Sequence, residues 1–100
     1  MTKHANSNHI YTDGSKSDNG VGFGVVYGRT LDNHLRGTLP KCSTVFTAEL
    51  HAIFKALSIV EDSEYRNWTI FTDSQAAMQA ITQLTPRHHL VKSIQKRLAF

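Results

Sequence analysis

The stretch Ile-Tyr-Thr-Asp-Gly-Ser at positions 10–15 decides the interpretation of this chain. Its first three residues favour β-structure, and the Asp-Gly-Ser that follows is typical of a turn. We therefore expect a strand over 9–13 that ends with the Asp13 carboxylate at its tip. A similar stretch, Ile-Phe-Thr-Asp-Ser, occupies 70–74, and a segment with helical periodicity between the two carries Glu49. We expect Asp13, Glu49 and Asp73 to meet at one edge of a sheet and to bind divalent metal ions.

Length and composition suit one compact domain. The chain has 100 residues, of which 40% are hydrophobic and 19% charged, and a net charge of +3 that fits a polyanionic partner. Cys42 is the only cysteine, which excludes an internal disulfide and a cysteine-rich zinc site. The sequence shows no apolar signal core and no run of membrane-spanning length, so we expect an intracellular protein, cytoplasmic or nuclear, with no membrane partner.

The first forty residues predict an antiparallel meander. Residues 1–8 form a flexible lead-in, and strands follow over 9–13, 21–29 and 34–39. The turn residues of Gly14–Gly20 are expected to reverse the chain after the first strand. Glycines at 20, 22 and 24 in or beside the second strand suggest a bulge or the close approach of another backbone.

The remaining residues predict helices around one further strand. Apolar residues at 46, 50, 53, 57 and 60 mark one helix face, with Ser43 or Thr44 as its cap and Glu49 at the edge nearest the sheet. A strand over 67–73, reached through that helix, is expected to run parallel to the first strand. Strands lie ~4.8 Å apart, so Asp13 and Asp73 can then share a metal. Ser74 caps a short helix through Leu84, and a last helix spans 87–100.

Three converging carboxylates imply a hard cation. They repel one another, and Mg²⁺ or Mn²⁺ is the oxygen-preferring ion that offsets this repulsion. Two such ions, ~3.5–4 Å apart, can promote phosphodiester hydrolysis with water as nucleophile. The scarcity of soft ligands argues against zinc. The sequence has no Gly-x-Ser-x-Gly elbow, Walker loop or dinucleotide fingerprint.

Three motifs in order resemble type 1 ribonuclease H, particularly the domains of reverse transcriptases from non-LTR retrotransposons. They are Tyr-Thr-Asp-Gly-Ser at 11–15, Thr-Ala-Glu-Leu-x-Ala-Ile at 47–53 and Thr-Asp-Ser-Gln-Ala-Ala at 72–77. The resemblance covers roughly residues 9–100. It implies an α/β fold, in which a mixed sheet of three antiparallel strands and one parallel strand carries flanking helices.

The resemblance also implies a function, cleavage of the RNA strand of RNA–DNA hybrids by a mechanism with two Mg²⁺ or Mn²⁺ ions. Asp13, Glu49 and Asp73 match three of the family's four metal-binding acids and are its catalytic residues here. The predicted substrate-binding positions are Gly14, Ser15 and Gln75, near the minor groove, and Thr44, which could help seat a phosphate. The hybrid is the expected partner, together with the rest of a reverse transcriptase polyprotein.

The sequence departs from the family pattern at its end. The family's fifth strand, histidine-bearing loop and last helix, which opens with a fourth aspartate, would all fall after Phe100. We therefore expect residues 9–100 to be a partial domain without its last strand and helix, from a truncated gene copy or a fragment.

Other interpretations of the same residues stay open. Alone, Asp13 suits a turn before glycine, Asp73 a helix cap, and Glu49 a surface glutamate on an amphipathic helix. The whole chain could be a catalytically inactive remnant or interaction module of a retroelement polyprotein, or a related nuclease or integrase that acts on DNA. Trp68 and Phe71 are interpreted as core residues, and the adjacent His88 and His89 as side chains that diverge on a helix.

Overall fold

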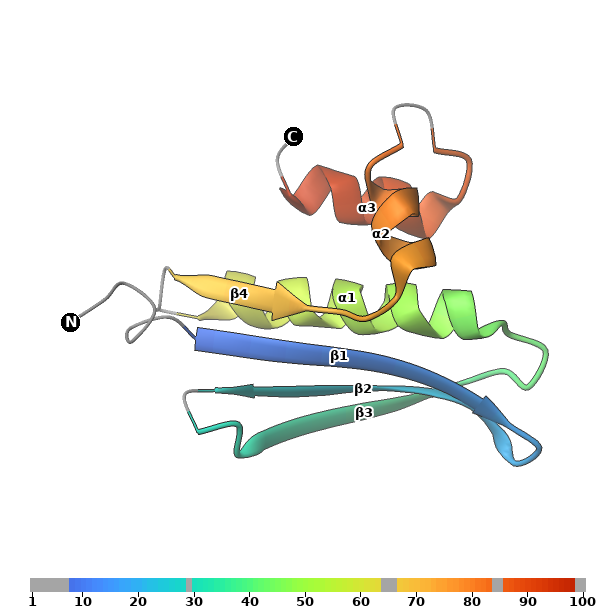
Figure 1. Cartoon of the computed structure of the whole chain (residues 1–100), viewed down its shortest axis with the longest axis horizontal. Helices are drawn as coiled ribbons and strands as arrows, with labels where there is room; N and C mark the ends of the chain where they lie inside the picture. Colours follow the sequence, from blue (N-terminus) through green and yellow to red (C-terminus); the bar gives the residue numbers. More distant parts are fainter. Residues whose placement is uncertain (1–7, 29, 64–66, 84–85, 99–100) are drawn as a thin grey trace.

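A four-stranded mixed sheet forms one layer of the molecule, and the described helices lie on one side of it (Figure 1). The computed structural model describes residues 8–28, 30–63, 67–83 and 86–98. The elements in chain order are β1 (Asn8–Ser17), β2 (Gly20–Gly28), β3 (Asn33–Leu39), α1 (Val45–Asp62), β4 (Trp68–Phe71), α2 (Gln75–Ile81) and α3 (His89–Leu98). The sheet order is β3-β2-β1-β4, with β1–β3 antiparallel and β4 parallel to β1. The predicted mixed α/β fold is therefore confirmed.

The first strand is longer than the sequence predicted. Asp13 does not end the strand, because β1 continues to Ser17 and pairs with β2 as far as Ser17 opposite Gly20. The reversal predicted over Gly14–Gly20 shrinks to Asp18 and Asn19, and the amide of Asn19 donates to Ser17 Oγ at 3.2 Å. Cross-strand pairing thus overrides the local turn preference of Asp-Gly-Ser.

The other boundaries shift by a few residues. β4 stops at Phe71 rather than at Asp73, α1 begins at Val45, and α2 ends at Ile81. Thr44, one of the two predicted candidates, is the N-cap of α1, and Ser74 is the N-cap of α2 as predicted. Predictions for residues 1–7, Arg29, Leu84 and 99–100 lie outside the described residues, while Asn8 begins β1 instead of belonging to the lead-in.

Helix α1 joins two core clusters. One cluster packs it against the sheet through Ile10, Val25, Ala52 and Ala56. The other packs it against α2 and α3, and its buried residues are Leu50, Ile53, Leu57, Ala77, Ala80, Ile81, Leu90, Val91 and Ile94. All these side chains are at most 8% exposed. The position of α1 relative to β1 is therefore fixed from both sides.

The opposite face of the sheet is open. Side chains alternate between the two faces of a strand, so Ile10 and Val25 point to α1 while Tyr11 and Val26 point away from it. In the described part of the chain, no helix packs on this second face (Figure 1). None of the described helices is both long and apolar enough to cross a membrane.

Candidate metal centre

Asp13 lies within β1, beside the point where its neighbour β4 stops. β4 pairs with β1 only as far as Phe71 opposite Tyr11, so none of the described strands flanks Asp13 on that side. The Thr12 hydroxyl donates to the Phe71 carbonyl at 3.0 Å and holds the two strands together at this point. The exposed Asp13 carboxylate therefore borders a gap in the sheet edge.

Asp73 enters this gap from the connection between β4 and α2. The Ser74 amide donates to Thr72 Oγ1 at 3.2 Å, and Ser74 Oγ accepts from the Ala77 amide at 3.1 Å. These bonds leave the Asp73 carboxylate free of the capping role, which Ser74 performs. The alternative interpretation of Asp73 as a helix cap is therefore wrong.

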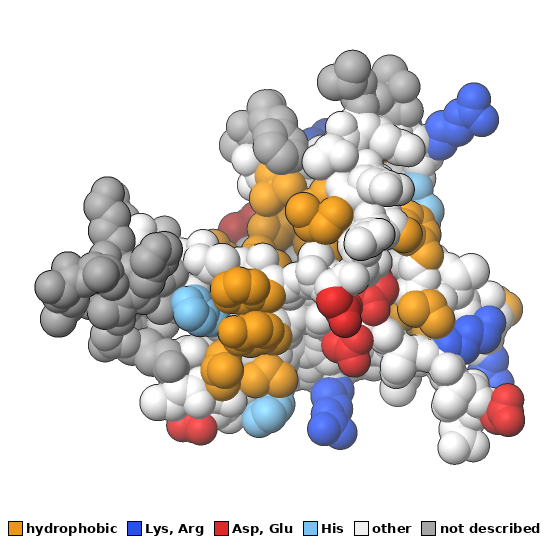
Figure 2. Space-filling view, viewed as in Figure 1, with side chains coloured by type: hydrophobic (Ala, Val, Ile, Leu, Met, Phe, Trp, Pro, Cys, Tyr) orange, Lys and Arg blue, Asp and Glu red, His pale blue; other side chains and the backbone are white. Residues whose placement is uncertain are grey.

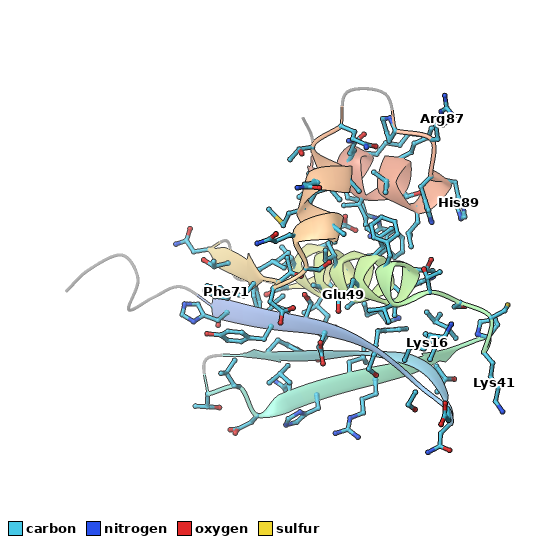
Figure 3. All side chains as sticks on the ribbon, turned by 45° about the vertical axis from the view of Figure 1, so that its right-hand side comes forward. Lys16, Lys41, Glu49, Phe71, Arg87 and His89 are labelled. Carbon is cyan, nitrogen blue, oxygen red and sulfur yellow. The ribbon has the colours of Figure 1, made fainter. Side chains whose placement is uncertain are left out.

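Glu49 reaches the site because α1 crosses β1 in close contact at Gly14. A Cβ on Gly14 would lie 2.6 Å from the Glu49 amide nitrogen and 2.9 Å from Ala48 Cβ, so only glycine fits there. The Gly14 N–H donates to Glu49 Oε1 at 2.8 Å. Glu49 is only 5% exposed, which rules out the alternative of a surface glutamate (Figure 3).

The three acids form one compact group. Carboxylate oxygens of Asp13, Glu49 and Asp73 lie within 4.8 Å of one another, as the sequence predicted. Burial raises the pKa of Glu49 most, the Gly14 hydrogen bond opposes this rise, and the charges of Asp13 and Asp73 add to it. Such a shift means that the ionised group is costly without a compensating positive charge.

A divalent cation fits this group of atoms. Glu49 Oε2 is buried and has no hydrogen-bond partner among the described residues. A buried carboxylate oxygen without a partner is expensive, and carboxylate oxygens are the ligands that Mg²⁺ and Mn²⁺ prefer. Asp13 and Asp73 are exposed, so an ion held there would remain accessible to a substrate.

The predicted substrate-binding residues surround the acids at different distances. Ser15 is exposed and follows Asp13 by two residues, and Gln75 lines a hollow of about 220 Å³ together with Asp73. Thr44 accepts from the Thr47 amide at 3.0 Å and lies about 7.5 Å from Glu49 along the helix axis. Gly14 has a structural role, since it admits α1 and binds Glu49.

Two aromatic interpretations of the sequence are wrong. Phe71 is 38% exposed rather than buried, and its ring stacks on the ring of Tyr11 with centroids 4.7 Å apart. His88 and His89 do not diverge, because their rings stack 5.5 Å apart and His88 Nδ1 accepts from the Leu90 amide. Arg36, which the sequence motifs did not indicate, lies across Gly24 from Asp13 in the strand register. Alternation of side chains along β3 is the signal that could have indicated it.

Comparison with known proteins gives one family and one fold. A family model of RNase H matches residues 5–98. The solved RNase H1 from the halophilic archaeon Halobacterium salinarum NRC-1 has a TM-score of 0.69 and 21% identity. LC11-RNase H1, solved in complex with an RNA/DNA hybrid, has a TM-score of 0.65 and 22% identity. Both alignments cover 93% of this chain and 74% of the solved one.

A search of curated proteins found no match. At 21–22% identity the solved structures establish the fold, and the family model, which matches nearly the whole chain, goes further. The chain belongs to the RNase H family.

Proposed function

We propose that this protein hydrolyses the RNA strand of RNA–DNA hybrids in a reaction that requires Mg²⁺ or Mn²⁺. The observation that carries the proposal is the group formed by Asp13, Glu49 and Asp73, with oxygens within 4.8 Å of one another and one buried oxygen without a described partner. Membership of the RNase H family and the hybrid bound to LC11-RNase H1 support this choice of substrate.

The three acids have different tasks in this proposal. Glu49, fixed by the Gly14 amide on the buried side, would hold the metal-binding geometry, while the exposed Asp13 and Asp73 face the substrate. Asp13, Glu49 and Asp73 would hold divalent metal, and the chemistry that such ions would supply is activation of a water molecule and stabilisation of the leaving oxygen of the RNA strand. Water is then the nucleophile, and no side chain forms a covalent bond to the substrate.

The residues around the acids fit contacts to the hybrid. Ser15 and Gln75 are exposed, and each follows an acid of the group, Asp13 or Asp73, by two residues. We assign them, with the backbone of Gly14, to the minor groove, where the 2′-hydroxyl distinguishes RNA from DNA. Thr44 begins an 18-residue helix whose N-terminal dipole favours a phosphate.

The proposed origin, partner and location of the protein rest on the sequence motifs alone. These motifs support an origin in a non-LTR retrotransposon, a reverse transcriptase polyprotein as partner and an intracellular location. The chain spans 74% of the length of the two solved structures.

Cleavage of labelled substrates tests the proposed reaction. We expect the RNA of an RNA–DNA hybrid to be cut with Mg²⁺ or Mn²⁺ and not with EDTA, whereas single-stranded RNA and double-stranded DNA stay intact. Because water rather than the 2′-hydroxyl attacks, the products should carry no 2′,3′-cyclic phosphate. Hybrid binding without cleavage by folded protein would instead support a non-catalytic interaction module.

A further inference from the structure

We propose that a pocket at the C-terminal end of α1 binds a guanidinium group, carried by an arginine side chain of a polypeptide partner. The pocket has a volume of about 480 Å³, and its described lining includes Asn8, Tyr27, Asn33, Ile59, Asp62 and Trp68. It lies on the face of the sheet that α1 covers. The inference stands beside the proposed function and does not rest on it.

The strand register places two aromatic side chains in this pocket. Ile10 packs under α1 and lies opposite Tyr27 of β2, so Tyr27 projects from the same face. Asn8 precedes Ile10 by two residues, shares its face and pairs with Trp68 of β4. Tyr27 and Trp68 are partly buried against the core cluster of the sheet. The start of β1 is therefore flanked by an aromatic residue on each neighbouring strand.

The pocket is separate from the acid group. From Glu49 to Asp62 the helix rises about 20 Å. Figure 2 shows acidic side chains gathered near the middle of the face that it presents, where the acid group lies. The end of α1 lies instead beside the start of β4 (Figure 1). A ligand in the pocket would therefore not contact the acid group.

The charge at this end of α1 favours a cation. A helix carries partial negative charge at its C-terminus, where its last carbonyls have no partner within the helix. The last turn of α1 contains no basic residue, but it ends in Glu61 and Asp62. Arg97 pairs with Glu61 at 2.8 Å, whereas the exposed Asp62 forms no ion pair with another described residue. A cation bound at Asp62 would offset both its charge and the helix dipole.

Aromatic walls beside a carboxylate favour a guanidinium group among the cations. This group is planar and weakly hydrated, stacks on aromatic rings and can form two parallel hydrogen bonds to one carboxylate. The amide oxygens of Asn8 and Asn33 can accept its remaining N–H groups. The chain itself contains the same combination, because Arg97 lies 4.3 Å from the centroid of the Phe54 ring and pairs with Glu61.

The pocket is large enough and accessible from outside the chain. Sites for small ligands have volumes of about 300–1,000 Å³. Asn33 and Asp62 are exposed, so a side chain of another protein can reach them. Gly28 supports the wall beside Asn33, because it has a φ of +104° and a Cβ there would lie 2.9 Å from Asn33 Nδ2.

The fluorescence of Trp68 reports on the pocket directly, because Trp68 is the only tryptophan of the chain. The probe is the capped tripeptide acetyl-Gly-Arg-Gly-amide, titrated into the protein. It is compared with the same peptide carrying citrulline, which resembles arginine in shape without its charge, and with the lysine peptide. Potassium chloride keeps the ionic strength equal, and EDTA removes divalent metal.

We expect the wild type to bind the arginine peptide about tenfold more tightly than the citrulline peptide. The lysine peptide should bind less tightly than the arginine peptide. Asp62→Asn should abolish the preference for arginine over citrulline. The matched control Glu61→Gln, which removes the neighbouring carboxylate, should retain it. Tyr27→Phe should keep the affinity for arginine, whereas Tyr27→Leu should weaken it.

Equal affinity of the wild type for arginine and citrulline, or an Asp62→Asn variant that still prefers arginine, would overturn the inference. A lysine peptide that binds as tightly as the arginine peptide would contradict the choice of guanidinium. Methylguanidinium that binds as tightly as the arginine peptide would replace the polypeptide partner by a free small cation. Because the assay contains neither RNA nor divalent metal, its failure is distinct from failure of the proposed ribonuclease activity.

Discussion

In the proposed function, Glu49 is the residue on which the metal-binding geometry depends. Its Oε1 is fixed by the Gly14 amide, and its Oε2 is buried beside two other carboxylates without a described partner. A side chain chosen only for stability would not be acidic here, because the raised pKa records an unfavourable ionised state. This conflict between stability and charge is typical of functional sites.

Glu49→Gln is expected to stabilise the protein in the absence of divalent metal, by about 1 kcal/mol near neutral pH. The raised pKa means that the folded state binds the proton more tightly than the unfolded state. The contribution of Glu49 to the free energy of unfolding therefore falls as the pH rises from 4.5 through the pKa of the folded state. Glutamine does not ionise and removes this loss. Thermal unfolding in EDTA measures the change.

Added Mg²⁺ provides the second half of this test. It should raise the midpoint of unfolding of the wild type by preferential binding to the folded state, and should raise that of Glu49→Gln much less. Asp62→Asn, at the far end of the same helix, serves as the control and should respond like the wild type. An equal response of all three proteins would contradict a metal site at Glu49.

His51 predicts a pH dependence of opposite sign. It stacks on Phe23 at 5.9 Å, and burial first, then the nearby His88 and His89, lower its pKa below 6.5. The unfolded state then binds more protons, so stability should fall as the pH drops below 6.5. This slope is at most about 1.4 kcal/mol per pH unit for one proton. Denaturant unfolding of His51→Phe, which keeps an aromatic ring, should show a shallower slope; an unchanged slope would contradict this role.

At the scale of elements, the crossing of α1 over β1 positions the acids. The crossing brings the Glu49 amide so close to Gly14 that a Cβ would overlap it at 2.6 Å. The two core clusters hold α1 between the sheet and the other helices, so the helix cannot retreat without loss of packing. Small displacements here would separate Glu49 from Asp13 and Asp73.

Gly14→Ala is therefore expected to destabilise the protein by about 1–3 kcal/mol. It should also reduce cleavage by more than the loss of folded protein that its lower Tm implies. Gly24→Ala is the matched control, because its Cβ finds only one atom within 4 Å, at 3.9 Å. That variant should be neutral or slightly stabilising. Equal effects of the two substitutions in denaturant unfolding would show that the crossing is not as tight as described.

At the scale of the whole molecule, the order of the sequence motifs predicted the fold and the acid group better than local turn and strand preferences did. The parallel pairing of β4 with β1 followed from a strand–helix–strand order, and this pairing brings Asp13 and Asp73 together. The end of β1 was not predictable, since Asp-Gly-Ser favours a turn and only pairing with β2 extends the strand to Ser17. Phe71 was misassigned because a short strand gives no signal of which face is covered.

The most direct test of the account compares Asp73→Asn with Asp62→Asn in Mg²⁺-dependent cleavage of an RNA–DNA hybrid. Both variants remove one exposed carboxylate, but only Asp73 belongs to the acid group. Loss of a metal ligand should cost more than the about 10–100-fold that outer-shell changes cost. We predict that Asp73→Asn loses cleavage by more than about 100-fold while Asp62→Asn cleaves like the wild type. Equal cleavage by both folded variants would contradict the assignment of Asp13, Glu49 and Asp73 as the active site.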